Sequence, residues 1–132
     1  MFSRGQLASL AGVNSETIRY YERKGLLPKP QRTPAGYRQY APNDLKRLQF
    51  ILAAKRHGFT LAEIKELLEL RVSDSATCRQ VRAKAQNKIT QIESQINLLI
   101  RMKTALQILA ATCHQNTPAD NCPILEAFDQ AI

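Results

Sequence analysis

The amino-acid sequence predicts a mainly α-helical protein with a winged helix-turn-helix head, a small β-wing and a long coiled-coil helix. Three observations predict this fold. Hydrophobic residues recur at helical spacing through most of the chain. A short segment with proline and glycine, residues 32–40, is typical of a β-hairpin. Residues 76–111 contain neither glycine nor proline, which predicts one uninterrupted helix.

The chain of 132 residues is strongly basic, with 19 Lys and Arg against 11 Asp and Glu, a net charge of +8 and a pI near 9.8. Residues 1–71 hold 13 of the cations and 6 of the anions, so nearly all of the positive excess lies in the first half. This charge favours an anionic partner such as nucleic acid or an acidic membrane surface. With 44% hydrophobic and 23% charged residues, the composition is typical of a globular chain.

Membrane and export signals are not visible in the sequence. No apolar run approaches the roughly 20 residues that a membrane span needs, and residues 1–5 do not open a secretory signal. Three cysteines, an odd number in a chain without an export signal, favour reduced thiols over a disulfide framework. We therefore expect a cytoplasmic protein with no membrane partner.

Two short crossing helices are predicted at the start of the chain. Apolar residues follow helical spacing between residues 2 and 11, Gly12 interrupts the pattern, and Ser15 is expected to cap a second helix. Ala8 permits a close approach of the two helices, and Ile18 fills the angle between them. This spacing is typical of a helix-turn-helix.

The second helix has polar residues that suit DNA on the faces it does not bury. Ser15 and Thr17 place short hydroxyls near its N-terminus, where they approach base edges, and Arg19 reaches a base or a phosphate. Gly25 is expected just past the C-terminus of this helix, and Pro28 prevents the helix from resuming.

The segment from Arg32 to Tyr40 predicts a small β-hairpin with Pro34 and Gly36 in its turn. Its two arginines and two aromatic residues are poor core material but suit contacts with phosphates. A plain surface loop is the alternative interpretation.

Two further helices are predicted after the hairpin. Residues 42–44 open the first, residues 57–59 end it, and Thr60 with Glu63 forms a capping box for the second. His57 lies near a helix end, so we expect a capping or surface histidine rather than a metal ligand.

One long helix is predicted from Ala76 to about Ala111, with Ser75 as its cap. A helix of about 35 residues is some 50 Å long, which a chain of this size cannot cover. A second copy in a two-fold dimer is the simplest partner, and packing within one subunit is the alternative. The residues that step by three and four, as in a coiled coil, are Ile89, Ile92, Ile96 and Leu99.

All three cysteines lie in the second half of the chain. Cys78 lies in the first turn of the long helix, Cys113 follows its end, and Cys122 comes nine residues later. About 50 Å of helix separates Cys78 from Cys113 within one chain. Antiparallel pairing of two long helices would instead place Cys78 of one subunit near Cys113 and Cys122 of the other. Three converging thiolates would make a soft, anionic site for a thiophilic metal ion. Without a dimer, three free buried cysteines are the expectation.

Three runs of sequence resemble the MerR family of transcription regulators: residues 17–27, residues 36–40 and residues 58–64. The resemblance covers essentially the whole chain. The second half resembles the metal-sensing branch of the family on the basis of Cys78, Cys113 and Cys122-Pro123-Ile124-Leu125.

The resemblance implies a homodimer with two winged helix-turn-helix heads and an antiparallel coiled coil. It implies residues 1–71 as the DNA-binding domain, 72–111 as the dimerisation helix, and 112–132 as the metal-binding loop and a short C-terminal helix. Such proteins bind double-stranded promoter DNA whose two polymerase-recognition elements are spaced too far apart. The inducer makes the dimer bend and undertwist the DNA so that RNA polymerase can use it.

The resemblance also assigns site residues. It implies DNA contacts by Arg19 and Tyr20 of the second helix, by Tyr37 and Arg38 of the wing, and by Lys55. Together with the residues singled out above, the predicted DNA-binding set is Ser15, Thr17, Arg19, Tyr20, Arg32, Tyr37, Arg38 and Lys55.

The three cysteines fall where mercury-sensing relatives place their trigonal thiolates, which gives Cys78, Cys113 and Cys122 as the metal ligands. His114 stands where zinc sensors tend to have a second cysteine. Hg(II) accepts three sulfur ligands, as does Pb(II), whereas zinc usually takes four ligands. The sequence thus favours Hg(II) as the inducer, with Pb(II), Cd(II) or Zn(II) as alternatives, and a heavy-metal resistance operon as the target.

Three other functions remain as alternatives. A thiol redox sensor would form a disulfide between Cys113 and Cys122. A metal-storage protein would leave the helix-turn-helix and the wing unexplained. An enzyme is not favoured, because the only adjacent Cys/His pair is Cys113 with His114, and neighbouring residues seldom point at one another.

Overall fold

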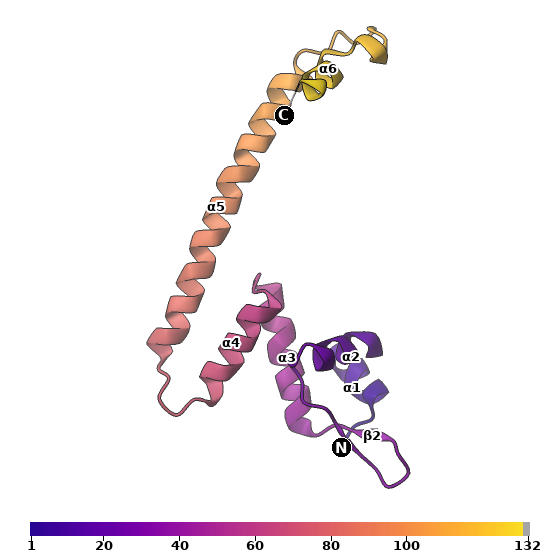
Figure 1. Ribbon diagram of the computed structural model, residues 1–132, viewed down its shortest axis with the longest axis vertical. Coiled ribbons are helices and arrows are strands. Elements are labelled where there is room, and N and C mark those ends of the chain that lie inside the picture. The colour runs from indigo at the N-terminus through magenta and orange to yellow at the C-terminus, as the bar shows by residue number, and fades with distance from the viewer. Residues whose placement is uncertain (131–132) are drawn as a thin grey trace. The chain divides into compact units, whose positions relative to one another are not determined.

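The computed structural model describes residues 1–130 and divides the chain into two compact units, Met1–Ala85 and Gln86–Ile132. The predicted mainly α-helical fold, with a small wing and a long helix, is confirmed (Figure 1). In chain order the elements are α1 (Arg4–Ala11), α2 (Ser15–Arg23), β1 (Gln31–Arg32), β2 (Arg38–Gln39), α3 (Pro42–Arg56), α4 (Leu61–Val72), α5 (Cys78–Ala110), the 3-10 turn η1 (Ala119–Asn121) and α6 (Pro123–Asp129).

Helices α1 and α2 form the predicted helix-turn-helix. Gly12 ends α1 with a φ of 72°, a left-handed conformation that glycine adopts without strain. The predicted cap of α2 is wrong by one residue. The Asn14 side chain accepts a hydrogen bond from the Thr17 amide at 2.9 Å, and Ser15 is already helical. An asparagine caps a helix as well as a serine does, so the earlier of the two residues takes the position.

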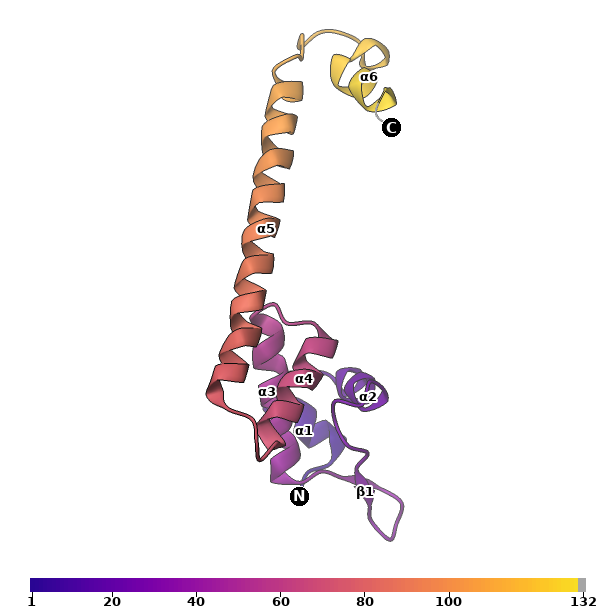
Figure 2. The same ribbon diagram turned by 60° about the vertical axis from the view of Figure 1, so that its left-hand side comes forward.

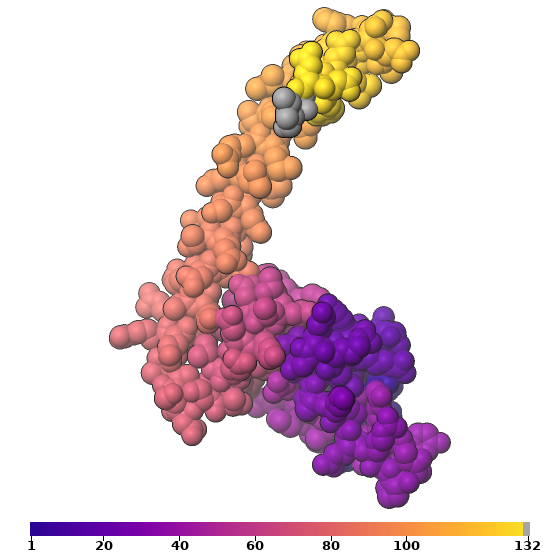
Figure 3. Space-filling model, viewed as in Figure 1, coloured from indigo at the N-terminus to yellow at the C-terminus, as the bar shows by residue number. Residues whose placement is uncertain are grey.

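The wing is a two-stranded antiparallel hairpin that pairs Gln31 with Gln39 and Arg32 with Arg38. Gly36 lies in its turn with a φ of 89°, as the sequence predicts. The hairpin loop extends from the body formed by α1 to α4 (Figures 2 and 3). An isolated bridge between Phe2 and Tyr40 joins the base of the hairpin to the start of the chain.

The core of the first unit lies among α1, α2, α3 and α4. One expectation for the wing is wrong here: Tyr40 is only 1% exposed and belongs to this core rather than to a phosphate-contacting surface. The buried residues are Leu7, Ala8, Ile18, Tyr21, Leu26, Leu27, Tyr40, Leu48, Ile51, Ile64 and Leu68.

The caps predicted for the third and fourth helices are confirmed. The Thr60 hydroxyl accepts a hydrogen bond from the Glu63 amide at 3.2 Å, and the Glu63 carboxylate accepts one from the Thr60 amide at 2.8 Å. His57 is exposed at the end of α3, where its Nδ1 lies 2.7 Å from the Ala53 carbonyl oxygen. It therefore occupies the capping position that the sequence predicts.

Helix α5 is continuous over 33 residues, but its predicted cap is wrong. The helix begins at Cys78. The amide of the preceding residue, Thr77, donates a hydrogen bond to the Gln80 side chain at 2.7 Å. The Ser75 hydroxyl instead pairs with that of Ser73, at 3.2 Å. Pro123 opens the short helix α6, as expected. None of the described helices combines the length and the apolarity that crossing a bilayer requires.

Candidate DNA interface and metal-binding thiols

Helix α2 presents two different faces. Ile18 and Tyr21 are buried and hold the helix against the core. On the opposite side Arg19 keeps half of its side chain exposed, and its guanidinium pairs with Glu16 at 3.1 Å. The Thr17 hydroxyl donates to Asn14 at 3.0 Å. The local fold thus fixes the backbone of α2 and leaves the cationic side chain of Arg19 half exposed on the outer side of the helix.

A basic hollow of 530 Å³ opens between α2 and the wing. It brings together three residues of the predicted DNA-binding set, Arg19, Arg32 and Arg38. Five cations around one hollow make a surface that attracts phosphates. The residues that line this basic hollow are Arg19, Glu22, Arg23, Lys29, Pro30, Arg32 and Arg38.

A second hollow lies between α2 and the end of α3, and we call it the α2–α3 hollow. It brings together three more predicted residues, Thr17, Tyr20 and Lys55. The Lys55 ammonium lies 5.9 Å from the centre of the Tyr21 ring, within the range of a cation–π contact. The residues that line it are Asn14, Glu16, Thr17, Tyr20, Tyr21, Arg23 and Lys55.

Two predicted residues line neither hollow. Tyr37 is 74% exposed on the hairpin, and Ser15 is half-buried at the first turn of α2. Two further cations that line the basic hollow, Arg23 and Lys29, are absent from the predicted DNA-binding set. Arg23 follows Arg19 by four residues on the same helix, a spacing that places both on one face. Lys29 stands between two prolines at the entry to the wing, and no pattern in the sequence marks it.

An acidic residue, Glu22, lies beneath this cationic surface. Its Oε1 accepts a hydrogen bond from the Tyr40 hydroxyl at 2.5 Å and lies 3.6 Å from Nη2 of Arg4. Its Oε2 lies 3.7 Å from Nη1 of Arg38. Nε of Arg4 also donates to the Tyr40 hydroxyl, at 3.2 Å. Burial and the hydrogen bond to Glu22 raise the pKa of Tyr40 to about 12.

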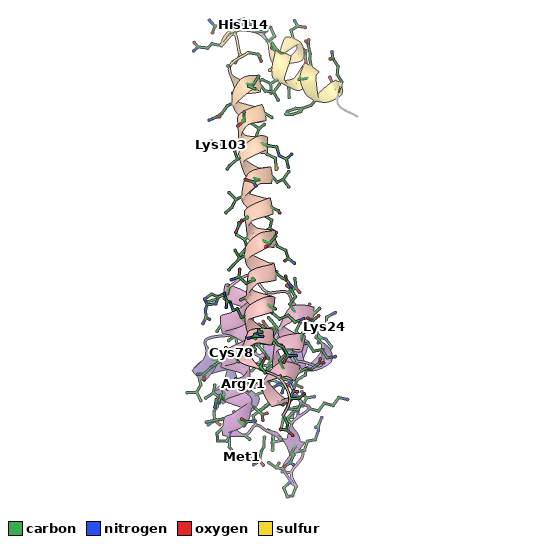
Figure 4. The ribbon with its side chains drawn as sticks, turned by 90° about the vertical axis from the view of Figure 1, so that its left-hand side faces the viewer. Met1, Lys24, Arg71, Cys78, Lys103 and His114 are labelled. Carbon is green, nitrogen blue, oxygen red and sulfur yellow. The ribbon has the colours of Figure 1, made fainter. Side chains whose placement is uncertain are left out.

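The three thiols are free and accessible, so the alternative expectation of three buried cysteines is wrong for this chain. Cys78 and Cys113 are exposed and Cys122 is half-buried. Cys78 is the first residue of α5, Cys113 follows the last residue of α5 by three positions, and Cys122 precedes α6. Figure 4 shows Cys78 at the start of α5 and His114 in the segment after its end. Within residues 1–130 of a single chain, no three His, Cys, Asp or Glu side chains gather closely enough to hold a metal ion.

The helix-turn-helix, the wing and the two cation-lined hollows define a winged helix-turn-helix protein of the DNA-binding class. The chain belongs to the MerR family. A model described as "MerR HTH family regulatory protein" matches residues 2–70, and one described as "MerR, DNA binding" matches residues 45–109. The prediction of a transcription regulator rather than an enzyme is thereby confirmed.

The chain is similar over nearly its whole length to characterised proteins. It is 44% identical to the mercuric resistance operon regulatory protein of Bacillus cereus, over 96% of each chain. It matches the crystal structure of the regulator PbrR691 from Ralstonia metallidurans in complex with lead(II), with a TM-score of 0.88 and 32% identity over 97% of this chain and 99% of that one. It also matches HiNmlR, a MerR family regulator bound to promoter DNA, with a TM-score of 0.58 and 26% identity over 84% of each chain.

Proposed function

We propose that the chain is a cytoplasmic, metal-responsive transcription regulator of a heavy-metal resistance operon. In this proposal two copies form a dimer, Hg(II) is the inducer, and Cys78 of one subunit binds it together with Cys113 and Cys122 of the other. The observation that supports it best is the position of the thiols at the two ends of a long helix. Residues 1–71 would bind DNA, 72–111 would dimerise, and 112–132 would complete the metal site.

The apolar residues of α5 support the dimer. The predicted seam is far from covered in one chain: Ile96 is 50% exposed and Leu99 is 60% exposed. Exposing such a row of large apolar side chains to water costs free energy, and pairing two helices recovers it. A groove beside Leu99, Met102 and Leu106 offers a hole of the kind that a side chain from a second helix fills.

The length of α5 supports an antiparallel pairing. Its 33 residues make a rod of about 50 Å, so Cys78 and Cys113 of one chain lie at opposite ends of the rod. An antiparallel partner reverses the order of the ends and places each Cys78 beside the partner's Cys113 and Cys122. The dimer would then contain two equivalent sets of three thiols.

The donor atoms fit a soft metal ion. Three thiolates without a fourth strong ligand suit Hg(II) and also Pb(II), whereas a zinc site usually has four ligands. The similarity to a mercuric resistance operon regulator and to a regulator that was crystallised with lead(II) points to the same class of ion. His114 would become relevant if the ion were zinc. Its carbonyl accepts a hydrogen bond from the Thr117 amide at 2.9 Å, within the loop between Cys113 and Cys122.

The two heads of the dimer would bind two half-sites of a promoter with overly wide spacing between its polymerase-recognition elements. The cations of the basic hollow and the α2–α3 hollow would hold phosphates on either side of α2, while α2 enters the major groove. Formation of metal–thiolate bonds across the dimer would favour one of two arrangements of the heads. The bound DNA would be bent and undertwisted in that arrangement, which makes the promoter usable by RNA polymerase.

The test is a titration of reduced protein with Hg(II), Pb(II), Cd(II) and Zn(II) in excess small thiol, followed by thiolate-to-metal absorption in the ultraviolet. We expect tight binding of Hg(II) that is lost in Cys122→Ser, with DNA binding of the metal-free variant unchanged. Gln115→Ser changes a residue of the same loop without removing a thiol and should bind metal normally. Preference for Pb(II), Cd(II) or Zn(II) would overturn the choice of mercury. Binding of none of the four ions would overturn metal sensing and leave redox sensing by the thiols.

A further inference from the structure

A carboxylate among the cations of the DNA-binding surface requires a physical reason. Glu22 lines the basic hollow together with five Arg and Lys residues. Negative charge near bound DNA repels phosphates and lowers affinity for any sequence. If only charge mattered, a protein with a neutral residue at position 22 would therefore bind DNA more tightly.

The Glu22 carboxylate is buried and uses both oxygens for contacts within the protein. Its side chain is 9% exposed. One oxygen faces the Tyr40 hydroxyl at 2.5 Å and Arg4 at 3.6 Å, and the other faces Arg38 at 3.7 Å. A buried carboxylate requires such partners, because an unpaired one would be strongly destabilising.

These contacts join the wing to α2. Arg38 and Tyr40 are two residues apart at the second strand of the hairpin, so they extend from the same face of the strand. Both therefore reach the same carboxylate on α2. Arg4 adds the first turn of α1 to the same cluster.

The wing requires an anchor of this kind. Its sheet consists of two residue pairs, Gln31 with Gln39 and Arg32 with Arg38. A two-stranded hairpin is at best marginally stable by itself in water. Contacts at its base, including the Phe2–Tyr40 bridge and the Glu22 cluster, hold it in a fixed place beside α2.

We propose that Glu22 is a positioning residue that fixes the wing against α2 through Arg38 and Tyr40, and thereby sets the specificity of DNA binding. The inference rests on the DNA-binding part of the proposed function. A fixed distance between α2 and Arg38 lets both engage DNA only in the correct register. A wing that is no longer fixed against α2 still attracts DNA by its positive charge, but it does not place Arg38 in that register.

The direction in which one substitution changes the DNA affinity distinguishes a positioning role of Glu22 from a simple effect of its charge. Glu22→Gln keeps the size of the side chain and removes its charge. If charge alone mattered, the variant would bind every duplex more tightly. If Glu22 positions the wing, affinity for the preferred duplex falls, while affinity for unrelated DNA stays equal or rises. We expect the ratio of specific to non-specific affinity to fall at least about tenfold, the size typical of one mispositioned specific contact.

The experiment uses metal-free, full-length protein and two probes. One is a duplex that the wild-type protein selects from a randomised pool, and the other is a scrambled duplex of equal length and composition. Both affinities are measured for wild type, Glu22→Gln, Arg38→Ala and the double variant. Glu69→Gln, which removes a charge from an exposed residue of α4, is the matched control and should keep the wild-type ratio.

In the Arg38→Ala background Glu22→Gln should change the ratio less than it does in the wild type, because only the contact with Tyr40 remains. An equally large effect in that background would overturn the route through Arg38, and an unchanged ratio in the single variant would overturn the proposal. Tyr40→Phe keeps the carboxylate and removes one of its partners, so it tests the same cluster if Glu22→Gln fails to fold; a wild-type ratio there contradicts the proposal. Failure of the wild type to prefer any duplex would overturn the proposed function itself, whereas the other outcomes would leave it standing.

Discussion

The two compact units of the chain treat their apolar residues in opposite ways. In the first unit Leu7, Ile18 and Leu48 are completely buried, and four helices share one core. In the second unit the large apolar residues of α5 are exposed to solvent, with Leu99 60% and Ile108 65% exposed. The first unit is thus stabilised by its own core, whereas in the second the apolar residues of α5 lack such cover, which a second helix would supply in the proposed dimer.

The contrast also separates the two tasks of the protein. A DNA-binding domain needs side chains in fixed positions, and the first unit holds them on capped helices that pack around one core. A switch needs an element that responds to a ligand, and thiols at the two ends of an uncovered helix suit that need. The predictions below test this division between a DNA-binding unit that is stable by itself and a helix that depends on a partner.

The largest effect is expected from a charge placed in the seam of α5. Ile96→Asp should convert the dimer to monomers, because a buried carboxylate without a partner is strongly unfavourable. Losing the second head should weaken specific DNA binding by a factor on the order of 100 or more. Light scattering and DNA affinity measure the two effects. Ser94→Asp lies on the opposite side of the same helix and should remain dimeric. A dimeric Ile96→Asp variant would remove the case for this seam.

A comparison of two alanine substitutions sharpens the contrast between the units. Leu48→Ala should destabilise the first unit by about 2–5 kcal/mol, the usual cost of a large truncation in a core. All four tyrosines lie within residues 20–40, so the tyrosine signal in the near ultraviolet reports this unit alone. Leu99→Ala should leave that signal unchanged and raise the protein concentration needed for dimerisation. An equal response of the tyrosine signal to both substitutions would contradict the division.

Arg19→Ala tests the candidate DNA surface at a single cation. If the guanidinium contacts a phosphate, the variant should bind DNA more weakly, and the slope of log affinity against log salt should fall by about 1 for each head. Arg101→Ala removes the same charge from α5, outside both hollows, and serves as the control. An unchanged slope for Arg19→Ala would exclude a phosphate contact.

The smallest effect is expected from Tyr40→Phe, which should cost about 1 kcal/mol at neutral pH through the lost hydrogen bond. Its dependence on pH is more informative. The pKa of Tyr40 is raised from 10.0 to about 12 in the folded protein. Between these values the folded state keeps a proton that the unfolded state has lost, so stability relative to Tyr40→Phe should fall as pH rises through this window. Denaturant unfolding at a series of pH values measures it, and a constant difference would contradict the shift.

The sequence predicts local features well where the signal lies within a few residues. The Thr60–Glu63 capping box, the turn at Gly36 and the start of α6 at Pro123 are all present. The cap at Ser75 is not, because Thr77 and Gln80 make the hydrogen bonds that start α5 and Ser75 pairs with Ser73. Several residues near a helix start compete for one position, and the sequence pattern does not rank them.

The sequence supplies candidate residues for the site but not their arrangement. The basic hollow requires α2 and the wing to lie side by side, and its Lys29 has no local signature. Tyr40 was expected at the surface because its partners are distant in sequence: Arg4 precedes it by 36 residues and Glu22 by 18. Contacts of that range arise from tertiary packing, which helical and turn patterns do not encode.

Mixed dimers test most directly whether thiols from two subunits form one metal site. In excess small thiol, Cys78→Ser and Cys122→Ser should each fail to retain Hg(II) as homodimers, because the small thiol competes successfully with two remaining thiolates but not with three. When the two are unfolded and refolded together, about half of the dimers are mixed, and each mixed dimer regains one complete set of three thiols. We predict that the mixture recovers Hg(II) binding, whereas a mixture of Cys113→Ser with Cys122→Ser does not, because no complete set can form. A Cys78→Ser and Cys122→Ser mixture as inactive as its parents would show that the site is not shared between subunits.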